Sequence, residues 1–165
     1  MSKLPLVYYP SPTLEQPSQK MIDVTAAQRL VPDMIDTMIA EHGIGLAAPQ
    51  IGTNIQLAII SKDADPSLKD HLAIINPKIY SASRDSVEDT EGCLSIPGVE
   101  GVVPRHKKIK VRFIGIDGLE TKIKATGLFA RVLQHEIDHL NGILFIERAT
   151  KITQGENSLS ESNTL

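Results

Sequence analysis

The sequence predicts an α+β fold, in which antiparallel strands pack around one central helix and another helix lies near the N-terminus. Helical patterns occupy residues 25–42 and 126–140, and several strand-like segments lie between them. Helices and strands that are segregated along a chain in this way are typical of α+β domains. With 165 residues, the chain suits one domain of the usual size, which we place at residues 1–149.

The composition narrows the class of protein. Hydrophobic residues make up 41% and charged residues 22%, as in soluble globular proteins, and no apolar run approaches the ~18 residues of a membrane span. The net charge of −3 argues against a large basic surface for nucleic acid, although it leaves room for a small basic patch. We therefore expect no membrane and no specific nucleic-acid partner. We also expect a monomer, although no feature of the sequence settles the oligomeric state.

The single cysteine and residues 1–10 indicate the cellular compartment of the protein. One cysteine, Cys93, cannot form a disulfide within the chain. Residues 1–10 lack the basic region and apolar core of a signal peptide. We therefore expect a reduced, cytoplasmic protein.

The first helix has recognisable ends. A proline-rich, extended arm occupies residues 1–24, and Thr25 with Gln28 forms a capping-box pattern. The helix should run to about His42 and stop at Gly43. Pro32 lies within it and either kinks the helix or begins a second one.

Short apolar segments between the helices read as strands. They occupy 55–60, 72–75, 78–80, 101–103, 108–116 and 119–124. Asn76-Pro77 is expected to separate the strands at 72–75 and 78–80. Asp117-Gly118 is expected to form a hairpin turn between the last two strands. Residues 81–90 are polar, 144–146 suggest a last strand, and the polar residues 150–165 are expected to be a flexible tail.

The second helix contains the strongest functional signal, the HExxH motif of residues 135–139. His135 and His139 are four apart, so both imidazoles lie on one helix face and reach one metal ion. Glu136 lies beside that face, where it can take a proton from an activated water. A solvated helix with chance histidines is the alternative, but this helix is apolar on two sides, and unpaired histidines buried there would be costly.

Two histidines leave the site incomplete, because catalytic zinc-type centres usually have three protein ligands and one open position. Phe145 stands where a longer metallopeptidase motif has its third histidine, and Glu156 and Glu161 lie in the polar tail. Cys93 is the natural candidate, since a thiolate beside a metal binds strongly. Taken alone, a single cysteine is more often a small buried apolar residue.

Three segments together resemble the peptide deformylase family: GIGLAAPQ at 43–50, EGCLS at 91–95 and QHEIDH at 134–139. The resemblance covers roughly residues 3–148. It implies antiparallel strands around the histidine-bearing helix, and removal of the formyl group from N-formylmethionine of nascent polypeptides, with release of formate. By motif, Cys93, His135 and His139 bind one divalent ion, physiologically Fe²⁺, which Zn²⁺, Ni²⁺ or Co²⁺ can replace.

The resemblance also implies roles for residues around the metal. Glu136 moves the proton between water and the leaving amine, and the Gln50 amide and Leu94 backbone N–H stabilise the formyl oxygen. Without the resemblance, Gln50 would read as an ordinary loop amide.

The substrate is expected to lie along residues 43–45. Gly43 and Gly45 permit close approach of the peptide backbone, and Ile44 and Gly45 pair with it as an added strand. Ile44, Leu128 and Val132 are candidate walls of the methionine pocket, although Val132 fits a plain core residue nearly as well.

The sequence leaves the roles of three charged residues open. Glu91 and Arg105 form either a supporting ion pair behind the metal loop or two separate surface charges. Glu100 replaces an arginine that many family members carry near the substrate path, which leaves the peptide preference open.

The sequence also leaves open whether the protein contacts the ribosome near the exit tunnel. Some family members dock on the ribosome with a basic C-terminal helix, and we expect no such helix here. A different HExxH peptidase and a non-catalytic metal protein are the competing functions.

Overall fold

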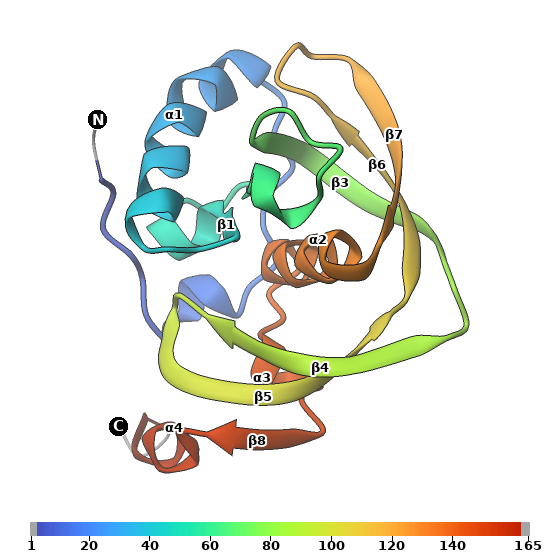
Figure 1. The fold of residues 1–165 in the computed structure, drawn as a ribbon. Coiled ribbons are helices and arrows are strands. Elements are labelled where there is room, and N and C mark those ends of the chain that lie inside the picture. Colours follow the sequence, from blue (N-terminus) through green and yellow to red (C-terminus); the bar gives the residue numbers. More distant parts are fainter. Residues whose placement is uncertain (1–2, 163–165) are drawn as a thin grey trace.

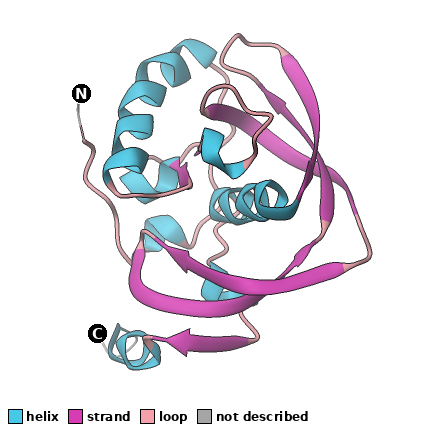
Figure 2. Cartoon of the chain, viewed as in Figure 1, coloured by secondary structure: helices cyan, strands magenta, loops and turns pink. Residues whose placement is uncertain are grey.

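The computed structural model describes residues 3–162 and has the predicted α+β architecture (Figures 1 and 2). The helices are α1 (Val24–Ala40), α2 (Gly127–Leu140), α3 (Phe145–Arg148) and α4 (Glu156–Ser162), with three 3₁₀ turns, η1 (Pro12–Leu14), η2 (Ala48–Ile51) and η3 (Lys62–Ala64). The strands are β1 (Gly45–Ala47), β2 (Leu57–Ile60), β3 (Leu72–Ala82), β4 (Ser86–Cys93), β5 (Ile96–His106), β6 (Lys108–Ile114), β7 (Glu120–Thr126) and β8 (Lys151–Gln154).

Two antiparallel sheets surround α2. One sheet has the order β1-β2-β3-β6-β7 and the other β4-β5-β8. Figure 1 shows α2 in the middle of the molecule, between the β3–β6–β7 side and the long β4–β5 ribbon. No helix among residues 3–162 is long and apolar enough to cross a membrane.

The central helix is buried on most of its circumference because two sets of side chains leave it in different directions. Its apolar set packs with the inner residues of β6 and β7 in the main hydrophobic core: Phe129, Ala130, Leu133, Ile137 and Leu140. Its polar set is also buried and contacts the β4–β5 ribbon, except for Glu136, which lies against Gly45 of β1. A helix with buried polar groups needs specific partners for them, and these partners form the functional site.

Helix α1 begins one residue before the expected start and is a single helix. Asp23, and not Thr25, is the N-cap: its carboxylate accepts a hydrogen bond of 2.8 Å from the Thr25 backbone N–H. The capping-box prediction was therefore wrong. Pro32 lies inside the helix without dividing it.

Several strands are longer than the sequence pattern indicates. β3 runs through Asn76-Pro77, since Asn76 adopts a φ of 50° and the ladder to β6 shifts register between Ile75 and Lys78. The polar residues 86–90 belong to β4, which pairs with β5 along its length. Polarity hid this strand because its side chains are mostly exposed. The Asp117-Gly118 turn joins β6 to β7 as predicted.

The C-terminal part also differs from the prediction. Residues 144–146 do not form a strand, since Phe145 begins α3. The segment expected to be a flexible tail contains β8, which pairs with β5, and the short helix α4. Residues 163–165 lie outside the described residues.

The N-terminal arm is fastened to the end of α2. The Ser18 backbone N–H donates to the Leu140 carbonyl over 2.9 Å, and Gly142 lies directly under the arm. A Cβ on Gly142 would lie 2.6 Å from the Gln16 carbonyl carbon, and its φ of +73° is one that L-residues rarely adopt. Glycine at position 142 therefore meets two requirements: it adopts the positive φ that ends the helix, and it leaves room for the backbone of the arm.

We predict that Gly142→Ala destabilises the protein more than Gly118→Ala. Both glycines have positive φ, but no atom lies within 4 Å of a Cβ on Gly118. Gly118→Ala should lower the free energy of unfolding by about 1–2 kcal/mol through φ alone, and Gly142→Ala by more, because the arm must also move. Urea denaturation of the two variants measures the difference, and equal losses would contradict the role of the arm contact.

Candidate metal centre and substrate pocket

The two histidines of α2 meet the cysteine at the end of β4. The ligand atoms of Cys93, His135 and His139 all lie within 4.8 Å of one another, and the Cys93 Sγ is 3.2 Å from the His139 Nε2. The histidines converge because they are one helical turn apart, and β4 delivers Cys93 just before the turn into β5. The structure thus brings together the three ligands that the sequence predicted.

Glu91, two residues before Cys93 on β4, fixes the orientation of His135. Its Oε2 lies 2.9 Å from the His135 Nδ1, which leaves the Nε2 of that ring for a metal. Arg105 donates to both carboxylate oxygens, at 2.8 and 2.9 Å. The Glu91–Arg105 ion pair is therefore present, and it lies behind the metal loop.

Arg131 is the functional residue that our sequence reasoning missed. Its guanidinium donates to the Glu91 Oε1 over 2.7 Å and to the backbone carbonyls of Val103 and Val87. It thereby joins α2 to both β4 and β5. The available signal was a charged residue, four positions before His135, within the otherwise apolar first half of the helix.

Asp138 extends this network on the other side of Arg105. It accepts hydrogen bonds from Arg105 and from two nitrogens of Arg148. Phe145, at the position where a third histidine would stand in a longer motif, is 1% exposed and stacks near His135 with ring centroids 6.2 Å apart. It therefore acts as packing behind the metal site.

Glu136 lies in the pocket beside the ligands and is 4% exposed. Its Oε2 is buried without a hydrogen-bond partner among the described residues. Gly45 faces the carboxylate so closely that any Cβ there would overlap Glu136. A buried carboxylate oxygen left without a partner indicates a group that comes from outside the chain.

Burial governs the protonation of these groups. It raises the pKa of Glu136 to about 7 and lowers the pKa of His139 well below its usual value. Burial also opposes charge on Glu91 and His135, but the hydrogen bonds to Arg105 and His135 outweigh it and hold the pKa of Glu91 below its usual range. Hydrogen bonds to Cys93 and Glu91 likewise raise the pKa of His135.

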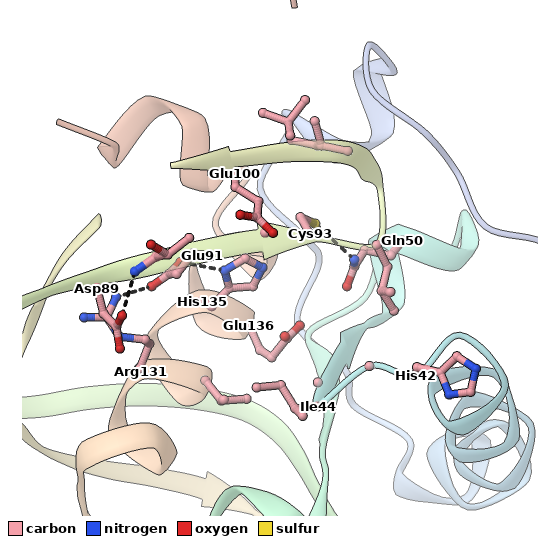
Figure 3. Close-up of a pocket in the computed structure, with 18 of the residues that line it drawn as sticks. His42, Ile44, Gln50, Asp89, Glu91, Cys93, Glu100, Arg131, His135 and Glu136 are labelled. Carbon is pink, nitrogen blue, oxygen red and sulfur yellow. Dashed lines mark hydrogen bonds and ion pairs between the residues drawn. The ribbon is translucent and has the colours of Figure 1, made fainter. Parts of the chain in front are cut away.

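The Gln50 side chain is held with its amide nitrogen toward the ligands. Its Oε1 accepts a hydrogen bond of 2.8 Å from the Ala47 backbone N–H, and its Nε2 lies 3.5 Å from the Cys93 Sγ (Figure 3). Leu94 follows Cys93 in the turn between β4 and β5 and also lines the pocket. Gln50 and Leu94, the two residues with candidate hydrogen-bond donors, thus line the same pocket as Cys93 and His135.

A cavity of about 510 Å³ opens onto these groups. All of the predicted substrate residues line it: Gly43, Ile44, Gly45, Leu128 and Val132. Leu128 and Ile44 are 49% and 44% exposed, whereas Val132 is buried and also belongs to the main core. His139 is not on the lining and approaches Cys93 from within the fold.

The far side of the pocket carries carboxylates. Figure 3 shows Glu100 above His135 and Asp89 beside Arg131, and both line the cavity with exposed side chains. The cavity also includes Arg131, whose charge is already paired with Glu91. The charges left unpaired at this side are therefore negative.

The donor set fits a divalent transition metal. One thiolate and two imidazoles suit Zn²⁺, Fe²⁺, Co²⁺ or Ni²⁺, and three protein ligands leave a coordination position that faces the cavity. The Glu91 contact to His135 is the kind of support that orients a ligating imidazole. Glu136 beside the open position completes an arrangement suited to metal-assisted hydrolysis.

Known proteins share this sequence and fold. The family model described as polypeptide deformylase matches residues 3–155. Peptide deformylase from Agrobacterium fabrum is 42% identical over 92% of this chain and 90% of its own length, and peptide deformylase 1 from a Nostoc species is 40% identical over 98% and 84%.

Solved structures of the same family also share the fold of this chain. The peptide deformylase from Synechococcus elongatus in complex with actinonin aligns with a TM-score of 0.84 at 38% identity, covering 98% of this chain and 85% of that one. A probable peptide deformylase from a Synechococcus phage aligns with a TM-score of 0.83 at 41% identity, covering 88% and 99%. The chain belongs to the polypeptide deformylase family, the metal-dependent hydrolases that remove the N-formyl group from nascent peptides.

Proposed function

We propose that Cys93, His135 and His139 hold one divalent ion, Fe²⁺ in the cell, at which this chain deformylates its substrates. The convergence of the three ligands beside the unpartnered carboxylate of Glu136 is the observation that supports this proposal. Zn²⁺, Ni²⁺ and Co²⁺ suit the same donors. The ion, when bound, supplies a Lewis acid that activates water and polarises the formyl oxygen.

Glu136 is the proton carrier of the reaction. Its carboxylate accepts a proton from the attacking water and delivers it to the nitrogen of the leaving amine. Close packing against Gly45 keeps the carboxylate pointed at the reacting atoms. The Gln50 Nε2 and the Leu94 backbone N–H donate hydrogen bonds to the formyl oxygen as negative charge develops on it.

The peptide binds along β1. This strand is at the edge of its sheet and pairs on one side with β2, so residues 43–45 can pair with a substrate backbone as an added strand. Leu128, Val132 and Ile44 then provide apolar contacts for the methionine side chain. Main-chain pairing carries little sequence information, which suits an enzyme that acts on many different nascent chains.

Formylated N-termini arise where translation occurs, so the proposed setting is the bacterial cytoplasm. An encounter with the ribosome near the exit tunnel belongs to this proposal, because nascent N-termini emerge there. The helix α4 carries no Lys or Arg, so α4 itself offers no basic contact. We propose that the enzyme acts as a monomer.

The activity is tested by formate release from a formyl-Met peptide with iron-loaded protein prepared without oxygen. We expect Glu136→Gln to keep its metal and to lose ~100-fold or more in kcat, because the proton acceptor is gone. Formate measurement and metal analysis on the same samples separate the two effects. Cleavage of internal peptide bonds without formate release would contradict deformylation, and full activity of the variant would contradict the role of Glu136.

The ligand role of Cys93 is tested by metal retention. Cys93→Ser replaces a thiolate with a hydroxyl that is a far weaker ligand, so we expect metal content after dialysis to fall well below that of the wild type. Glu136→Gln is the matched control, since it alters the same pocket without removing a ligand. Equal metal content in the two variants would refute the assignment.

The carboxylates of Glu100 and Asp89 should bias the enzyme toward basic peptides. We predict that kcat/KM for formyl-Met-Ala-Lys exceeds that for formyl-Met-Ala-Glu by ~3-fold, as expected for one exposed charge contact. Glu100→Gln should bring the ratio nearer to one, whereas Glu120→Gln, which is outside the pocket, should not. Added salt should weaken the preference, and equal rates for both peptides in the wild type would exclude it.

A further inference from the structure

Six exposed basic side chains gather on one face of the larger sheet, which we call the basic face. They come from β3, β6 and β7: Lys78, Lys108, Lys110, Arg112, Lys122 and Lys124. The alternate residues of β6 point the other way, into the core. Glu120, at one end, is the single acidic residue in these three strands.

The basic face is unusual because like charges lie directly opposite each other. Lys110 is paired with Lys124, and Arg112 lies between Lys122 on β7 and Lys78 on β3. Like charges placed directly across strands are destabilising. None of the six forms an ion pair with any residue in the described part of the chain. The fold thus tolerates repulsion that an external polyanion would relieve.

The charge concentration contrasts with the rest of the protein. The chain has a net charge of −3 with 17 Lys and Arg residues, and six of these 17 lie on one face of three adjacent strands. The remaining surface is therefore more acidic than the net charge indicates. An anionic partner would be attracted to the basic face and repelled elsewhere, which favours one orientation of approach.

The basic face and the pocket lie on opposite sides of α2. Residues 129, 130, 133 and 137 of this helix pack toward β6 and β7, whereas 128, 131, 132, 135 and 136 line the cavity. Figure 1 shows β6 and β7 on one side of α2 and the β4–β5 hairpin on the other. A partner on the basic face therefore leaves the pocket open to a peptide.

We infer that the basic face docks the enzyme on the phosphate backbone of structured RNA. Alternate residues of a strand lie ~7 Å apart on one face, so the cations form rows suited to a polymer with repeated charges rather than to one small anion. Lys and Arg contacts to phosphates position a protein without reading sequence. This inference rests on the family activity, because its substrates are nascent chains and these emerge from an RNA-rich particle.

RNA fits the basic face better than a lipid bilayer. An interfacial membrane site combines cations with large apolar side chains that insert, but the apolar residues of β6 are turned into the core, and the exposed Ile116 and Leu119 lie in the turn between β6 and β7 and not among the cations. The large exposed side chain on β3 is Tyr80, at 46%, and an aromatic ring of this kind can stack on an unpaired base.

The test is fluorescence anisotropy of a labelled RNA hairpin titrated with the full chain at several salt concentrations. The wild type should bind, with affinity that falls steeply with salt. Lys110→Gln/Lys124→Gln should lose ~10-fold in affinity, and its salt slope should be shallower by about 2, one unit for each lost phosphate contact. Its melting temperature should be unchanged or higher, because a repulsive pair is removed.

Lys20→Gln/Lys151→Gln is the matched control, since it has the same net charge and alters exposed lysines outside the three strands. It should retain the RNA affinity, and both double variants should release formate from a formyl-Met tripeptide at the wild-type rate. Equal affinity losses in the two double variants, no RNA binding by the wild type, or binding only to phosphatidylserine vesicles would each overturn the inference. None of these outcomes changes the result of the deformylase assay. The RNA-docking inference and the proposed deformylase function can therefore be refuted independently of each other.

Discussion

The buried carboxylate of Glu91 is the contact on which the metal centre depends. It accepts hydrogen bonds from Arg105 and Arg131 and lies against the Nδ1 of His135. Taking charges out of water costs several kcal/mol for each ion unless they are paired and hydrogen-bonded. The carboxylate therefore stays in place only while β4, β5 and α2 all keep their positions, and the ring of His135 is fixed by the same condition.

This network explains why a small α+β fold can hold several buried polar groups close together. The site brings a buried carboxylate, two imidazoles and a thiol close together in space, and each would be unfavourable alone in an apolar interior. The arginines supply compensating charge from behind, where they do not compete for the open side of the metal site. The Glu136 Oε2 is buried without a hydrogen-bond partner in the described chain, as is the Nδ1 of His139, and a carboxylate oxygen left free in this way suits the proposed chemistry of Glu136.

The two sides of α2 have separate physical tasks. Its apolar residues form the main core with the larger sheet and provide most of the favourable burial. Its polar residues depend on that core for their position, because a metal site must be held rigidly to act on one bond of the substrate. The outer surface of the same sheet carries the basic face, so one layer of strands separates an external charged surface from the apolar core that supports the helix.

The sequence alone determined the central helix, the family and the candidate ligands, because their signals are local: HExxH needs only helical periodicity, and EGCLS and GIGLAAPQ are contiguous. Tertiary structure decided what depends on distant partners. Arg131 has a role only because α2 lies against β4, and β3 continues through Asn76 only because β6 pairs with it. The polar strands β4 and β8 escaped prediction for the same reason, since pairing with β5, and not their own hydrophobic pattern, stabilises them.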